Sequence, residues 1–177
     1  MGVLFRRFLD LCLMRAGPQD LPASQTLLTL VLGLYVATGA LLTTPLYGIV
    51  PSLLGAALDG GFMWLYTLAL LSAVGLRART LQTVSALAGA GTVFNLLALP
   101  LVQSLADLDP QRLETGAGGF SSVLYLVLLV WLLVVYGHVF RNALDRGRPV
   151  GLAAAFGYLL FSTMIVQMAL PPVEVPG

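Results

Sequence analysis

The stretch FSSVLYLVLLVWLLVVYGHVFR (residues 120–141) contains no Asp, Glu, Lys or Arg before its last residue, Arg141. Between residues 123 and 135 its only strongly polar group is the Tyr125 hydroxyl. A helix of about 20 apolar residues is long enough to cross the ~30 Å hydrocarbon core of a bilayer. We therefore expect residues 120–140 to span a membrane.

Four other stretches have a similar length and character, at residues 25–42, 57–76, 83–103 and 150–169. The chain as a whole is 58% hydrophobic and 10% charged, with a mean hydropathy of +0.93. Soluble domains contain about a quarter charged residues. The sequence therefore predicts an all-α, polytopic membrane protein with five transmembrane helices, forming one domain over residues 24–170.

The basic side chains are placed unevenly along the chain. Eight of the nine lie in three short segments that precede the first span, separate the second from the third, and separate the fourth from the fifth. They are Arg6, Arg7, Arg15, Arg77, Arg79, Arg141, Arg146 and Arg148. Short arginine-rich loops stay in the cytoplasm, because translocation of a guanidinium is unfavourable. We therefore expect a membrane protein with a cytoplasmic N-terminus, an external C-terminus and an external tail over residues 171–177.

Residues 1–16 have the pattern of an amphipathic helix. Arg6, Arg7 and Asp10 share a narrow polar stripe at a 3.6-residue period, and apolar side chains cover the rest. The periodic part is only about 18 Å long as a helix, too short to span. We expect this helix to lie in the membrane interface.

The third span contains small residues at repeated four-residue spacing, a pattern that lets helix backbones approach closely in a membrane. The residues that we expect to pack in this way are Ser85, Ala86, Gly89 and Ala90.

Asp59 is the one ionisable residue inside an apolar stretch and far from its ends. Two interpretations are open. Asp59 could cap the N-terminus of the second transmembrane helix, with its carboxylate accepting free backbone N–H groups. Alternatively, it could be an intramembrane functional carboxylate, for example in a proton relay.

Three other polar residues fall at a similar depth. Counted along a helix from the nearest arginines, Asp59, Asn95, Tyr125 and Gln167 all lie about 24 to 29 Å from the cytoplasmic side. We expect them to form one polar layer in the outer half of the bundle. The layer could consist of interhelical hydrogen bonds that fix the packing. It could also be a vestibule for an ion, a lipid headgroup or a partner helix.

The sequence gives little sign of enzymatic chemistry. Cys12 is the only cysteine and His138 the only histidine, and neither has a carboxylate or second ligand at a useful spacing. Serines lack a paired base, and the net charge of +1 provides no field for nucleic acid. We expect no catalytic residues, no metal and no cofactor.

Two segments resemble bacterial members of the Yip family of five-span membrane proteins. They are RTLQTVSALAG (residues 79–89), at the start of the third span, and GHVFRNAL (residues 137–144), which follows Trp131 at the end of the fourth. The eukaryotic members interact with Rab GTPases, so the resemblance implies a non-enzymatic role.

Together with the resemblance to bacterial Yip proteins, these features favour a small scaffold, partner-binding subunit or assembly factor of a bacterial inner membrane. Its partners would be the bilayer and another membrane protein or a second copy of the chain. The alternative is a transporter or channel component that uses the polar layer around Asp59.

Overall fold

The computed structural model describes residues 2–106 and 119–169, and within these residues all regular structure is helical. In chain order the helices are α1 (Gly2–Cys12), η1 (Pro18–Asp20), α2 (Gln25–Tyr47), α3 (Ile49–Ala73), η2 (Arg77–Arg79), α4 (Thr80–Ala106), α6 (Gly119–Leu144) and α7 (Arg148–Ala169). Five of the described helices are long and apolar enough to cross a membrane, namely α2, α3, α4 with η2, α6 and α7. The predicted tail at residues 171–177 lies outside the described residues.

The helices extend beyond the predicted spans, most clearly at the start of α3. This helix begins at Ile49 rather than near residue 57, with Gly48 as its N-cap. The sequence around Pro51 fits either a connection or the first turns of this helix, and Pro51 lies in the first turn of α3, where a missing backbone N–H leaves no hydrogen bond unmade. Pro45 lies inside α2 and Pro100 inside α4, so neither proline ends its helix.

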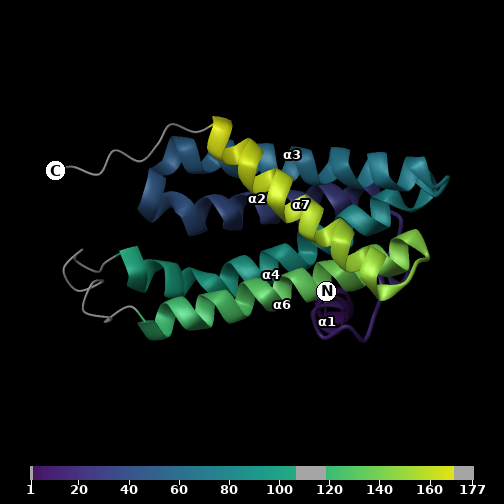
Figure 1. Cartoon of the computed structure of the whole chain (residues 1–177), viewed down its shortest axis with the longest axis horizontal. Helices are drawn as coiled ribbons and strands as arrows, with labels where there is room; N and C mark the ends of the chain where they lie inside the picture. Colours follow the sequence, from purple (N-terminus) through teal and green to yellow (C-terminus); the bar gives the residue numbers. More distant parts are fainter. Residues whose placement is uncertain (1, 107–118, 170–177) are drawn as a thin grey trace.

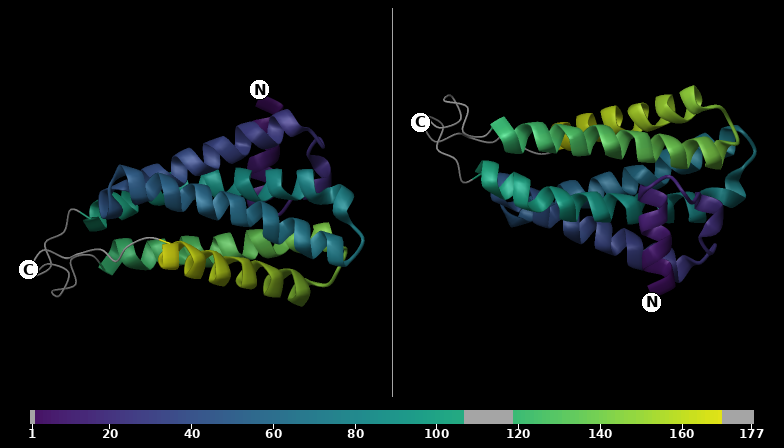
Figure 2. Two further views of the ribbon diagram at one scale, coloured as in Figure 1. Left: turned by 90° about the horizontal axis from the view of Figure 1, so that it is seen from above. Right: turned by 90° about the horizontal axis from the view of Figure 1, so that it is seen from below.

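The five long helices form a bundle of two layers (Figures 1 and 2). The α6–α7 hairpin makes one layer, and α2, α3 and α4 make the other. The layers join where α4 packs on α6 and α3 packs on α7. The α3–α4 and α6–α7 connections, with their arginines, lie at the same end of the bundle as α1 (Figure 1). We call this the arginine end.

Helix α4 forms the centre of the packing. Every residue from Thr83 to Gly91 is buried, including the four small residues at which we expected close packing, Ser85, Ala86, Gly89 and Ala90. At Gly91 a side chain as small as a methyl group would lie 2.6 Å from the Tyr136 hydroxyl and would also overlap the Tyr35 ring. Glycine at this position therefore allows two tyrosines from α2 and α6 to pack directly against the α4 backbone.

Helix α1 packs against α4 and α6, with its axis running across the bundle (Figures 1 and 2). Leu11 and Cys12 are buried there. The Trp131 indole donates a hydrogen bond of 3.2 Å to the Cys12 carbonyl, and the Gln82 amide donates one of 2.7 Å to the Leu21 carbonyl. Side chains from two spanning helices thus hold the N-terminal segment in place.

Candidate functional site

Asp59 lies in the interior of α3, where it is half-buried. The prediction that it caps this helix is wrong, because the helix begins at Ile49 and Gly48 occupies the cap position. The backbone N–H groups around Asp59 already belong to the continuing helix. Its carboxylate must therefore find partners on other helices.

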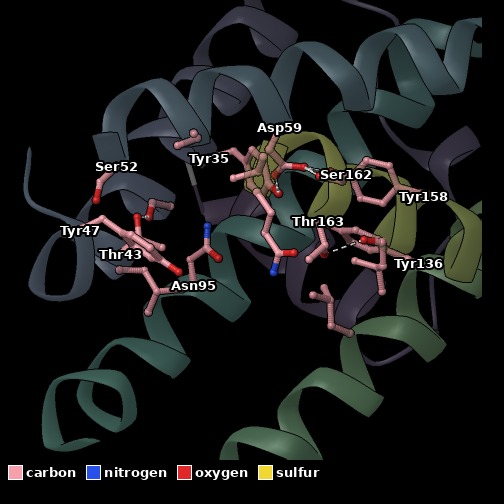
Figure 3. Close-up of a pocket in the computed structure, with 18 of the residues that line it drawn as sticks. Tyr35, Thr43, Tyr47, Ser52, Asp59, Asn95, Tyr136, Tyr158, Ser162 and Thr163 are labelled. Carbon is pink, nitrogen blue, oxygen red and sulfur yellow. Dashed lines mark hydrogen bonds between the residues drawn. The ribbon is translucent and has the colours of Figure 1, made fainter. Parts of the chain in front are cut away.

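Three hydroxyl groups from two other helices donate to this carboxylate (Figure 3). Tyr35 of α2 donates to Oδ2 of Asp59. Tyr158 of α7 donates to Oδ1 at 2.7 Å, and Ser162, one turn later, donates to the same oxygen. A carboxylate oxygen has two lone pairs, so Oδ1 is fully used while Oδ2 keeps one lone pair free. The three donors fix the carboxylate without supplying any positive charge.

Asp59 lines a cavity of about 640 Å³ to which all five long helices contribute residues. Ligand-binding pockets for small molecules typically measure about 300–1,000 Å³. Most of the lining comes from the halves of the helices farther from the arginine end: the second half of α2, the first half of α3 and the second halves of α4 and α7. The cavity thus lies toward the end of the bundle that contains the α2–α3 turn.

The chemical character of the lining is aromatic, hydroxylic and anionic. Five of the six tyrosines in the sequence line the cavity, and the described lining contains no basic side chain. The five are Tyr35, Tyr47, Tyr125, Tyr136 and Tyr158. Figure 3 shows Asp59 with Tyr35, Ser162 and Tyr158 at one side, Tyr47 and Ser52 at the other, and Asn95 between them.

Ser52 is a buried polar group of the lining with no partner. Its residue is 1% exposed, and its hydroxyl makes no hydrogen bond to any described residue. An unsatisfied buried hydroxyl is unfavourable by about 1–3 kcal/mol. Because Ser52 lines the cavity, a molecule held there could supply the missing partner.

The four residues of the predicted polar layer, Asp59, Asn95, Tyr125 and Gln167, all line this cavity. They do not form one hydrogen-bonded set among the described residues. The Asn95 amide instead donates to the Thr38 hydroxyl at 3.3 Å, and Asp59 bonds to Tyr35, Tyr158 and Ser162.

Sequence reasoning missed the three hydroxyl donors to Asp59. Tyr158 and Ser162 carried a usable signal, because they stand four residues apart and so share one face of a helix. Tyr35 carries no such signal, since α2 has no arginine at either end from which the depth of Tyr35 in the membrane can be counted.

The other candidate residues lie away from the cavity. His138 Nε2 is 3.1 Å from the Ala16 carbonyl oxygen and 3.0 Å from Asn142 Nδ2, so it packs the N-terminal segment against α6. Cys12 is buried in α1, and this burial raises the pKa of its thiol from 9.0 to about 11. Among residues 2–106 and 119–169, no three His, Cys, Asp or Glu side chains are grouped as metal ligands would be.

Comparisons of the chain with protein-family models, with curated proteins and with solved structures found no match. The site must therefore be interpreted from its own geometry.

Proposed function

We propose that this chain is a transporter component of the bacterial inner membrane that holds a small ligand against Asp59. The arginine end would lie in the cytoplasm and the cavity would open toward the outside. The observation that carries this proposal is the carboxylate of Asp59, fixed by three hydroxyls inside an apolar bundle and facing a cavity of about 640 Å³. Ionisable residues within spanning helices are unfavourable and commonly mark the path of a substrate or ion.

A purely structural role explains less of the site. An interhelical hydrogen bond needs only a neutral side chain, and a packed bundle leaves few voids larger than a water molecule. Here a charged group and a cavity of ligand size occur together. Their coincidence supports binding rather than packing alone.

A binding experiment tests this proposal directly. Purified protein in detergent is screened by thermal unfolding against amines, amino acids, carboxylates, sugars and inorganic cations. A ligand present at about 100 times its dissociation constant stabilises the folded state by about 2.7 kcal/mol. We expect at least one class of ligand to stabilise the wild type but not Asp59→Asn. Proteoliposomes that contain the wild-type protein should then accumulate that ligand.

Asp145→Asn is the matched control, because it removes the same charge from an exposed residue in the α6–α7 connection. Asp145 has a positive φ of 56°, a conformation that asparagine tolerates well. This variant should retain binding and uptake. If no class of ligand depends on Asp59, the transporter proposal is wrong.

A scaffold or assembly factor is the second candidate, in keeping with the resemblance to the Yip family. It is favoured by an apolar groove between α2 and α3 that shares no lining residue with the cavity and includes Leu28, Gly33, Leu53 and Trp64. A methyl group added at Gly33 would meet nothing within 4 Å, so a partner helix has room to approach. A scaffold should co-purify with one membrane protein in a fixed ratio, and Asp59→Asn should not change that ratio.

A further inference from the structure

The charge of the cavity restricts what it can hold. Asp59 is the only charged residue among the described residues that line the cavity, and hydroxyl donors orient a carboxylate but do not neutralise it. An uncompensated charge in the membrane interior is unfavourable. No basic side chain of the described lining supplies the compensating positive charge, so a ligand or a proton is left to supply it.

Size and hydrogen bonding distinguish between the possible cations. A proton or a bare metal ion needs no cavity of about 640 Å³ lined by tyrosines. The free lone pair on Oδ2 of Asp59 accepts one more donor, and the oxygens of Tyr35, Tyr158 and Ser162 still have lone pairs of their own. This arrangement of acceptors suits an ammonium group with several N–H donors.

The opposite side of the cavity adds a second contact. Ser52 and Asp59 stand seven residues apart on α3, so they lie on the same face, about 10 Å from each other along the helix. Between them Gly55 and Ala56 line the cavity and leave room for a ligand body. Ser52, whose buried hydroxyl has no partner among the described residues, lines the cavity at the far end of this stretch from Asp59.

We propose that the cavity binds a protonated primary amine with an apolar body and a hydrogen-bonding group at its far end, with the ammonium on Asp59 and the far group on Ser52. This inference rests on the proposed function, since it names the ligand class of the same site. Aromatic rings around the body add apolar contact and attract the cation by their faces.

Three probes of one shape test the proposal by calorimetric titration of the purified protein. Tyramine has an ammonium with N–H donors, its trimethylated analogue has the charge without those donors, and tyrosol replaces the ammonium with a neutral hydroxyl. We expect tyramine to bind, the trimethylated analogue to bind at least tenfold more weakly, and tyrosol not to bind measurably. Equal binding of tyrosol, or of the trimethylated analogue, would overturn the proposal.

Two variants assign the ends of the ligand. Asp59→Asn should weaken tyramine at least tenfold. Ser52→Ala, which leaves the carboxylate intact, should weaken tyramine several-fold but leave phenethylamine, which lacks the far hydroxyl, unchanged. Tyramine binding that survives Asp59→Asn contradicts the inference, as does an equal effect of Ser52→Ala on both amines.

The two proposals can fail separately. If no amine binds but another ligand class stabilises the protein through Asp59, the amine inference is wrong and the transporter proposal stands. If no ligand of any class depends on Asp59, both are wrong.

Discussion

Replacement of Tyr158 by phenylalanine removes one of the three hydroxyl donors to Asp59 while keeping the ring. The ring is almost completely buried, and it packs against Phe62 at 5.9 Å and Tyr136 at 5.8 Å between centroids. Because these contacts survive, the change in stability reports mainly the lost bond of 2.7 Å to Oδ1 of Asp59.

The magnitude follows from the charge of the acceptor. Hydrogen bonds to charged groups contribute about 1.5–3 kcal/mol, whereas interhelical bonds in membranes contribute about 0.6 to 2 kcal/mol. We expect Tyr158→Phe to lower the free energy of unfolding by about 1.5 kcal/mol in the wild type, the lower end of the overlap between these ranges. In an Asp59→Asn background the acceptor is a neutral amide, and the same change should lower it by only about 0.5 kcal/mol.

Unfolding in mixed micelles of rising sodium dodecyl sulfate, followed by circular dichroism, measures all four proteins of this double-mutant cycle. The coupling energy should be about 1 kcal/mol. Tyr47→Phe is the control, because the Tyr47 hydroxyl lines the same cavity without a hydrogen bond to any described residue, and its effect should stay within about 0.5 kcal/mol. Equal losses for Tyr158→Phe in both backgrounds would mean that the carboxylate is not held as a charged group.

Three further predictions concern packing, pH and topology. Gly151→Ala should destabilise the protein by about 1–3 kcal/mol in the same assay, because the new methyl group would collide with backbone atoms of α6. Gly33→Ala is the control and should be nearly neutral, because its methyl group would meet nothing within 4 Å. The Cys12 thiol should resist alkylation at pH 8 and react once the protein unfolds. Burial raises the pKa of this thiol from 9.0 to about 11, so as the pH rises the unfolded chain loses the thiol proton before the folded chain does. The free energy of unfolding should therefore fall between pH 9 and about 11 in the wild type but not in Cys12→Ala. In a Cys12→Ala background, a membrane-impermeant maleimide added to intact spheroplasts should label Ile49→Cys and spare Arg146→Cys; the reverse pattern would invert the proposed orientation.

The sequence predicted the number of long helices well, because length and hydropathy alone decide whether a helix can cross a membrane. It left the start of α3 undecided between a connection and the first turns of the helix. Gly48 and Pro51 are typical of a connection, and only the structure shows that Gly48 is the N-cap and that Pro51 falls within the first turn.

The site was predictable in its depth but not in its contacts. Distance from the arginines placed Asp59, Asn95, Tyr125 and Gln167 at one level, and all four line one cavity. Which side chains bond to Asp59 depends on the rotation and neighbours of each helix. Hydropathy carries no such information for α2, whose residues are apolar around most of its circumference.

The attachment of α1 has a consequence for biosynthesis. The segment of α1 leaves the ribosome before α6, yet Trp131 and His138, two of the residues that hold it, lie in α6 and are made much later. Until α6 has been inserted, Cys12 and Ala16 lack these partners, so this segment reaches its final place among the last. Nascent chains stalled before Trp131 should therefore leave the Cys12 thiol open to alkylation, and chains stalled well after His138 should protect it.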